Sequence, residues 1–177
     1  MIHINYTALI IGTMAIVLFS WHFSVKEKRY HGIARFFAFE SIFILILLNL
    51  KVWFRDPFSI HQIISWILLI ISLYPAVAGL ILLKKTGRPE NSFENTTVLV
   101  RSGLYKYIRH PLYCSLILLG TGIMLKDSGN IQLIAGAVNL IAIYITSRIE
   151  EREMISRFGD SYIHYMKETK MFIPFIF

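Results

Sequence analysis

The chain has 177 residues, of which 55% are hydrophobic and 16% are charged. A soluble domain carries about 25% charged residues, so this composition excludes an ordinary soluble protein and indicates an integral membrane protein. The net charge of +7 at pH 7 fits contacts with anionic lipid headgroups, and no nucleic-acid-binding motif accompanies it. The single cysteine, Cys114, excludes an internal disulfide and a cysteine-based zinc cluster. We expect no metal site.

The sequence has five apolar segments, of which the first three are each close to the ~20 residues that cross a bilayer and the last two are shorter. They cover about 4–23, 36–54, 60–83, 111–125 and 131–147. We interpret the first as a retained span, because it lacks the basic start and small-residue cleavage site of a signal peptide. The last two are joined by a short polar turn, which predicts an antiparallel helical hairpin. The predicted fold class is therefore an all-α integral membrane protein with about five transmembrane helices.

The sequence predicts a single membrane domain, residues 1–177, in two parts. Residues 1–83 hold three N-terminal spans, and residues 84–177 hold a connector, the hairpin and a tail. The fifth span is expected to continue as a helix to about Phe158 and Gly159. Beyond it, the spacing of Tyr162, Tyr165 and Met166 is amphipathic, so we expect the tail to lie in the membrane interface.

Basic residues are distributed unevenly over the connecting segments. Fifteen of the eighteen Lys and Arg residues fall in 24–35, in 84–111 and after 147. The other three, Lys51, Arg55 and Lys126, fall in the turns expected on the opposite side. Because basic loops stay on the inner side of a membrane, we expect the N-terminus outside and the C-terminus in the cytoplasm, in a multi-pass protein of the cell's inner or plasma membrane.

The stretch from Leu99 to Tyr113 (LVRSGLYKYIRHPLY) is a long polar, aromatic and basic interlude in this apolar chain. Pro111 suits the first position of a helix, and the free N–H groups of a helix start, beside Arg109 and His110, suit a carboxylate or a phosphate. Two interpretations stay open from the residues alone. The stretch binds an anionic ligand, or its basic residues contact lipid headgroups.

A run of carboxylates, Glu150, Glu151 and Glu153, follows the fifth span. Paired carboxylates there can bind a ribose diol, an ammonium group or a metal. The alternative is a solvated helix in which Arg148 pairs with Glu151 three residues on.

Three polar residues fall inside predicted spans. A carboxylate such as Glu40 is costly in hydrocarbon and is therefore a functional hypothesis. Two alternatives stay open: a neighbour such as Asn139 or a tyrosine hydroxyl satisfies Glu40, or Glu40 lies near the interface. Asn49 and Asn139 are expected to form interhelical hydrogen bonds. Gly120 and Gly122 are expected to allow close helix packing.

Taken together, these motifs resemble a known family. The 99–113 stretch, Glu150-Glu151, Phe158-Gly159 and the two tyrosines at 162 and 165 occur in the order found in the isoprenylcysteine carboxyl methyltransferase family and the related phospholipid methyltransferases. The resemblance covers roughly residues 96–175, while the first three spans match only in being apolar.

This resemblance implies an integral membrane enzyme that uses S-adenosyl-L-methionine in a pocket formed by the last helices and their cytoplasmic connectors. Carried over residue by residue, the implied cofactor-binding residues are Thr97, Val98, Leu99, Val100, Tyr105, His110, Pro111, Leu112, Tyr113, Glu150 and Glu151. Methyl transfer is a direct displacement that needs orientation rather than a protein nucleophile, so no catalytic residue is assigned.

One position departs from the family pattern. Relatives that methylate a prenylcysteine carboxylate carry an arginine one helical turn before Glu150, and this chain has Thr146 there. Arg148 is a weak substrate-side candidate on a different helix face. The acceptor is expected to be a small lipophilic molecule or lipid with a carboxylate, hydroxyl or amine headgroup. A membrane reductase using NADPH and a non-catalytic protein with a retained cofactor pocket are the alternatives.

Overall fold

The computed structural model describes residues 5–26, 29–90 and 95–176. Ile4 and Lys28, which were counted in the first span and in the basic loop, lie outside the described residues. Within the described ranges the chain is helical, and its only strand pairings are two isolated bridges. The helices are α1 (Tyr6–Ser20), α2 (His31–Asn49), α3 (Ile60–Thr86), α4 (Pro111–Met124), α5 (Asn130–Phe158) and α6 (Asp160–Glu168).

The predicted all-α membrane fold is confirmed. Four of the described helices, α1, α2, α3 and α5, are long and apolar enough to cross a bilayer. The fourth predicted span, α4, has 14 residues, which at 1.5 Å per residue reach about 21 Å, less than the hydrocarbon thickness. Helix α5 runs without a break through 29 residues, so the expected extension of the last span beyond residue 147 is also confirmed.

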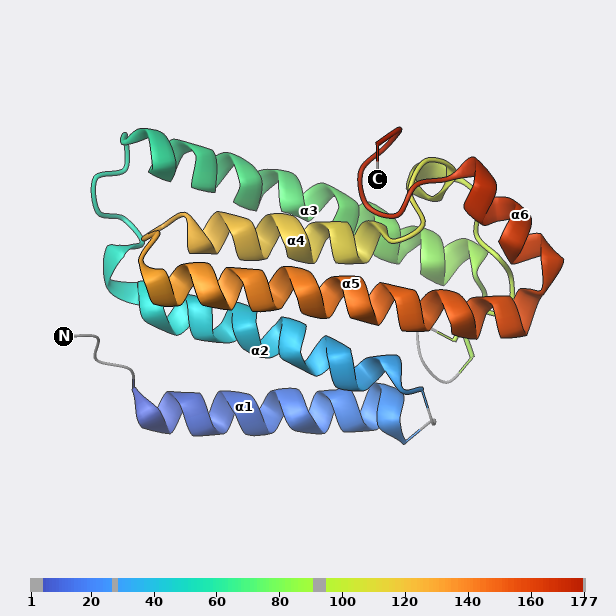
Figure 1. Ribbon diagram of the computed structural model, residues 1–177, viewed down its shortest axis with the longest axis horizontal. Coiled ribbons are helices and arrows are strands. Elements are labelled where there is room, and N and C mark those ends of the chain that lie inside the picture. Colours follow the sequence, from blue (N-terminus) through green and yellow to red (C-terminus); the bar gives the residue numbers. More distant parts are fainter. Residues whose placement is uncertain (1–4, 27–28, 91–94, 177) are drawn as a thin grey trace.

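The long helices lie side by side (Figure 1). Helix α2 packs against α5, α3 packs against α4, and α1 packs against α2, so that α1 and α3 lie at opposite edges of the bundle. Isoleucine and leucine side chains on the outward faces are exposed, as in Ile10 and Ile70. Large exposed apolar surfaces mark membrane or protein contacts, and this one agrees with a membrane setting.

Polar side chains fix the register between these helices. Asn49 Nδ2 donates to the carbonyl of Ile123 at 2.9 Å, and Asn139 Nδ2 donates to the carbonyl of Ala38 at 3.0 Å. The two expected interhelical hydrogen bonds are therefore confirmed. Close packing at Gly120 is confirmed as well, because a Cβ atom there would lie 2.5 Å from Asn139 Oδ1.

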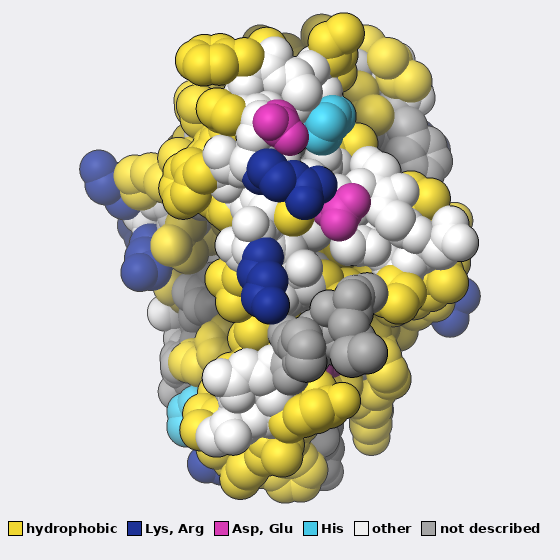
Figure 2. Space-filling model, turned by 90° about the vertical axis from the view of Figure 1, so that its left-hand side faces the viewer, with side chains coloured by type: hydrophobic (Ala, Val, Ile, Leu, Met, Phe, Trp, Pro, Cys, Tyr) yellow, Lys and Arg dark blue, Asp and Glu magenta, His cyan; other side chains and the backbone are white. Residues whose placement is uncertain are grey.

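Lys126 joins α3 to the turn between α4 and α5 at one end of the bundle. Its Nζ donates to Gln62 Oε1 at 3.0 Å and lies 3.6 Å from the centroid of the Trp66 ring. Only 2% of Lys126 is exposed. Figure 2 looks onto this end of the bundle and shows a few charged side chains among hydrophobic ones, in agreement with the low count of basic residues expected there.

The opposite end is built by the connector and the tail. Gly159, with φ of 56°, ends α5 and turns the chain into α6, a conformation that glycine adopts without strain. The segment after α6 then folds back. The backbone N–H groups of Arg109 and His110 donate to the carbonyls of Lys170 and Met171.

Part of the tail packs into the protein itself, and its position in the membrane interface stays a prediction. Met171 and Phe172 are buried in one cluster with Tyr113 and Ile143. The amphipathic spacing applies to α6 only, because the residues that follow form irregular turns. Because these residues are not helical, the spacing of their buried side chains shows no helical periodicity, and the sequence did not predict their burial.

Candidate active site

A cavity of about 230 Å³ lies between the helical bundle, the connector and α6. Its walls combine apolar side chains with a small set of polar and charged ones, as is typical of ligand pockets. The lining residues are Arg35, Phe39, Leu83, Thr96, Leu99, Val100, Tyr105, Arg109, His110, Leu112, Tyr113, Ser115, Leu116, Glu150, Met154, Phe158, Tyr162 and Tyr165.

The start of α4 positions His110. Pro111 occupies the first turn of the helix, and His110 precedes it in a non-helical conformation with φ of −124°. Such geometry is expected before proline. The backbone of His110 is tied to Met171, and its ring lies against the rings of Tyr113 and Phe172, with centroid distances of 5.5 and 6.1 Å. The imidazole is therefore held on three sides.

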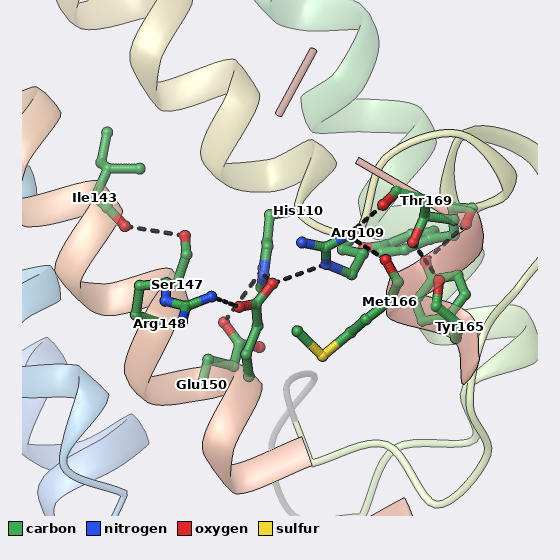
Figure 3. A network of polar contacts seen from close by, with 11 residues as sticks. Arg109, His110, Ile143, Ser147, Arg148, Glu150, Tyr165, Met166 and Thr169 are labelled. Atoms are coloured by element: carbon green, nitrogen blue, oxygen red, sulfur yellow. Dashed lines mark hydrogen bonds and ion pairs between the residues drawn. The ribbon is translucent and has the colours of Figure 1, made fainter. Parts of the chain in front are cut away.

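Two carboxylates of α5 approach this imidazole (Figure 3). His110 Nδ1 lies 3.9 Å from Glu150 Oε2, and Nε2 lies 3.5 Å from Glu151 Oε1. Nε2 is buried and has no hydrogen-bond partner among the described residues. A buried polar atom of this kind is costly unless a ligand or water satisfies it, so the geometry favours a ligand beside His110.

Glu150 and Glu151 are adjacent in the sequence and differ in their surroundings. Glu150 lines the cavity together with Tyr113. Glu151 is turned toward arginines: Arg109 Nε donates to it at 2.7 Å and Arg148 Nη1 at 2.9 Å. The ion-pair interpretation therefore describes Glu151, while Glu150 is the carboxylate available to a ligand.

Tyrosines of the connector and α6 form another wall. The Tyr165 hydroxyl donates to the carbonyl of Tyr105 at 2.6 Å, and Tyr162 packs against the Tyr165 ring. Burial raises the pKa of Tyr105, Tyr162 and Tyr165 above the ordinary tyrosine range. These side chains therefore remain neutral and present hydroxyl groups and aromatic faces.

The structure brings together seven of the eleven implied cofactor-binding residues. Those that line the cavity are Leu99, Val100, Tyr105, His110, Leu112, Tyr113 and Glu150. Thr97 and Val98 are exposed beside it, Pro111 is buried in the first turn of α4, and Glu151 faces the arginines. Their role as cofactor contacts stays a prediction for all eleven.

Comparison with known proteins identifies the family. The model of the isoprenylcysteine carboxyl methyltransferase family matches residues 67–156, half of the chain, including the start of α4 and Glu150. The chain belongs to this family. The matched segment carries much of the cavity wall but stops before the α6 tyrosines.

Curated relatives in this methyltransferase family match a similar stretch. Methanethiol S-methyltransferase 1 of Bradyrhizobium diazoefficiens is 37% identical over 71 residues, which are 40% of this chain and 24% of that protein. The methanethiol S-methyltransferase of Crocosphaera subtropica is 34% identical over 74 residues, 41% of this chain and 28% of that protein. The one from Mycobacterium tuberculosis is 27% identical over 71 residues, 40% and 28% respectively. The matched stretch thus covers about a quarter of each relative.

Arg35 and Phe39 of α2 also line the cavity of this family member, and the sequence did not reveal them. Arg35 was counted among the loop charges, because it stands at the edge of an apolar run. In the structure α2 begins at His31, five residues before the predicted start at 36, which places Arg35 inside the bundle. Its position among the aromatic residues at 36, 37 and 39 was the available signal.

Three further candidates lie away from the cavity. Thr146 is fully buried and its hydroxyl donates to the carbonyl of Ala142 at 2.6 Å. The Arg148 side chain is 49% exposed and pairs with Glu151, so it does not reach the cavity. Glu40 accepts from Thr13 Oγ1 at 2.6 Å; the partner is thus neither Asn139 nor a tyrosine.

Proposed function

We propose that the protein is an integral membrane methyltransferase that uses S-adenosyl-L-methionine and acts on a small lipophilic acceptor. The observation that carries the proposal is the placement of His110 and Glu150 in one cavity, inside the segment that matches the family. The unequal distribution of basic residues supports a cytoplasmic position for this cavity, where a soluble cofactor is available.

The residues of the cavity fit the cofactor. Its ribose hydroxyls and ammonium group need an acceptor such as Glu150, and its carboxylate needs donors such as the His110 ring and the free N–H groups at the start of α4. The buried Nε2 of His110 makes no hydrogen bond among the described residues, and the nearest carboxylate oxygen, Glu151 Oε1, is 3.5 Å away. The faces of Tyr105 and Tyr113 suit an adenine ring or a sulfonium cation.

When bound, S-adenosylmethionine supplies a methyl group that a nucleophile can attack directly. The chain's own contribution is to hold the two reactants in line and to exclude water. Leu112, Leu116 and Phe158 provide apolar walls, while the His110 ring lies beside the Glu150 carboxylate. No side chain needs to become a covalent nucleophile.

For the acceptor, we propose a thiol. The curated relatives are named methanethiol S-methyltransferases, and the apolar lining suits a small sulfur compound better than a polar headgroup. The carboxylate, hydroxyl and amine acceptors that the sequence left open are competitors in the same assay.

Calorimetric titration of the purified protein in lipid nanodiscs tests the cofactor. We expect heat of binding with S-adenosylhomocysteine and none with NADPH. The reverse result would favour a membrane reductase, and no heat with S-adenosylhomocysteine would contradict the proposed function.

Methyl transfer tests the reaction itself. With methyl-labelled S-adenosylmethionine and a short alkanethiol, we expect the label in a thioether, identified by mass spectrometry. Label in an ester, ether or methylamine would correct the acceptor. Cofactor binding without transfer to any acceptor or lipid extract would favour a non-catalytic protein that has retained the pocket.

A further inference from the structure

We infer that the turn formed by residues 173–176 inserts into the acyl chains of the leaflet at the basic end of the bundle, and that this contact holds the tail against the cavity. The partner is the bilayer itself, bound through apolar side chains that lysines flank. The depth of the turn can be measured whatever the reaction is, whereas the effect on the cofactor rests on the proposed function.

The first observation is a change of character within the tail. Helix α6 exposes polar side chains such as His164 and Lys167. The turn that follows exposes apolar ones: Ile173, Phe175 and Ile176 are 50%, 82% and 75% exposed. Because exposed apolar clusters mark membrane or protein contacts, α6 has the surface of a helix in water and the turn has the surface of a segment in lipid.

The second observation is the depth at which α4 begins. A Cβ atom on Gly79 would lie 3.3 Å from Pro111, so the start of α4 is level with Gly79 of α3. Lys84 follows Gly79 by five residues, about 7.5 Å nearer to the headgroups. Helix α4 adds about 21 Å in the other direction, and the two lengths together approach a hydrocarbon thickness of about 30 Å. Helix α4 is therefore short because it begins inside the bilayer.

The third observation is that the turn continues the lipid-facing surface of α3. The connector packs closely on this helix, because a Cβ atom on Gly103 would lie 2.7 Å from Leu82 Cδ1. Tyr107 follows in the connector, and its ring centroid lies 6.0 Å from that of Phe175. Ile81 of α3 is 45% exposed. The tail returns from α6 to this level (Figure 1), so the turn extends the apolar surface of α3 toward the start of α4.

The backbone of the tail meets the main requirement for irregular structure in hydrocarbon, which is that its polar groups are paired. Backbone hydrogen bonds of 2.8, 3.0 and 3.2 Å join residues 107–110 to residues 170–171. Within the turn, the N–H of Ile176 donates to the carbonyl of Ile173 at 3.3 Å. Pro174 has no N–H group to satisfy. The pairing therefore lets the tail reach the acyl chains without a helix.

Basic side chains flank the turn on its headgroup side. Lys106 and Lys170 are exposed, and Lys106 Nζ lies 6.0 Å from the centroid of the Tyr107 ring. Arg148 of α5 is 49% exposed at the same end of the bundle. Long basic side chains extend to the headgroups while their stems stay in apolar surroundings, and anionic lipids attract them. This arrangement favours a membrane over a second protein as the partner of the turn.

The turn acts on the cavity through Phe172, which directly precedes it. Phe172 is 5% exposed, and its ring centroid lies 6.1 Å from that of His110. The backbone N–H of His110 also donates to the carbonyl of Met171. A turn that is held in lipid keeps these contacts in place, so the His110 ring stays ordered for the cofactor.

Electron paramagnetic resonance of a nitroxide label measures the depth of the turn in lipid nanodiscs. The chain has a single cysteine, so Cys114→Ala removes it and Phe175→Cys adds the labelling site. Reference labels come from Ile70→Cys, on an exposed apolar face of α3, and from His164→Cys, on the exposed face of α6. At position 175, as at position 70, relaxation by oxygen should exceed relaxation by a water-soluble nickel chelate. The reverse is expected at position 164.

Two results would overturn the inference. A label at position 175 that is as accessible to the nickel chelate as the label at position 164 would place the turn in water. A label at position 175 that is shielded from both reagents would mean that a second copy of the chain covers it. If the variant without Cys114 does not fold, Phe175→Trp in the otherwise unchanged chain decides. Dibrominated acyl chains should quench the added fluorescence, and quenching by aqueous iodide alone would contradict insertion.

Titration with S-adenosylhomocysteine measures the effect of the turn on the cavity. In the double variant Phe175→Ser/Ile176→Ser we expect binding in nanodiscs to weaken by about 3- to 10-fold, because the turn loses its apolar contacts with lipid. Ile163→Ser, at a position of α6 that is 39% exposed, should match the wild type. If the double variant does not fold, Phe175→Ser alone decides, and weaker binding is again expected.

Unchanged binding of S-adenosylhomocysteine by the turn variants would contradict the link between the turn and the cavity. The failure of the proposed function has a different signature. If the wild-type protein does not bind S-adenosylhomocysteine, the proposed function fails, and the label at position 175 still decides whether the turn lies in the bilayer.

Discussion

Arg109 and Glu151 are 42 residues apart in the sequence, and Nε of the arginine lies 2.7 Å from Oε1 of the glutamate. The two side chains are 9% and 2% exposed. Arg109 also donates to the carbonyls of Met166 and Thr169. This one ion pair therefore joins the connector, α5 and the end of α6.

Replacing Glu151 with Gln should destabilise the protein by about 3–5 kcal/mol, because it leaves a buried guanidinium without its carboxylate. Unfolding in a denaturing detergent titration measures this loss. Arg148→Gln removes the exposed partner of the same carboxylate and should cost less than about 1 kcal/mol. Equal losses of stability in the two variants would show that the ion pair with Arg109 contributes no more than the exposed pair with Arg148.

Glu150→Ala and His110→Ala should each abolish binding of S-adenosylhomocysteine, since both side chains face the cavity. Lys106→Ala should have a mild effect, because Lys106 is exposed and does not line the cavity. Calorimetric titration compares the three variants. Normal binding of S-adenosylhomocysteine by the Glu150→Ala variant would show that Glu150 is not a cofactor contact and, like Glu151, serves only in ion pairs.

Phe172→Ala should weaken cofactor binding as well as stability. The ring is 5% exposed and lies against His110, so its removal leaves a void and frees the imidazole. A buried Phe→Ala change costs about 3–5 kcal/mol. Ile173→Ala, at an exposed neighbouring position, is the control for thermal unfolding and for titration. A stable Phe172→Ala variant with normal binding would show that the tail does not support the site.

Lys126→Met should destabilise the other end of the bundle by about 2 kcal/mol, through loss of the contact with Trp66 and of the donor to Gln62. Thermal unfolding followed by tryptophan fluorescence measures the change. Cofactor binding should be unaffected at temperatures where the variant is folded. Lys51→Met, an exposed lysine at the same end, should leave stability unchanged.

The buried tyrosines predict how stability depends on pH. Burial raises the pKa of Tyr105, Tyr162 and Tyr165 in the folded state, whereas in the unfolded chain these groups ionise near the ordinary pKa of about 10. The unfolded state therefore loses protons first, so stability is constant below that pH and falls as the pH rises through it. Ultraviolet absorbance of tyrosinate follows the titration. Ionisation of all nine tyrosines near pH 10 in the folded protein would contradict the burial argument.

Much of this fold follows from local sequence. Apolar length predicted the helices, Pro111 predicted the start of α4, and the distribution of polar residues predicted the bonds of Asn49 and Asn139. The motifs predicted His110 and Glu150 in one region, because both flank the same hairpin. Each of these features depends on residues close in sequence or on a single helical period.

The remaining features depend on contacts between distant segments. Arg35 reaches the cavity because α2 packs along α5, and the aromatic residues beside Arg35 indicate burial without indicating which helix packs there. Met171 and Phe172 are buried because the tail pairs with residues 107–110, through backbone groups that every residue carries. The partner of Glu40 on α1 could not be chosen, since several hydroxyl and amide groups were equally plausible.

The hydrogen bonds that set the helix register have a consequence for how the protein can evolve. The side chains of Asn49, Ser65 and Asn139 all donate to backbone carbonyls on a neighbouring helix. A carbonyl is supplied by any amino acid, so the accepting positions can change their side chains without losing the bond. Correlated substitutions across a family reveal contacts only where both partners are side chains. Hydrogen bonds from a side chain to a backbone carbonyl would hold the helices in register as the family diverges, without producing correlated substitutions.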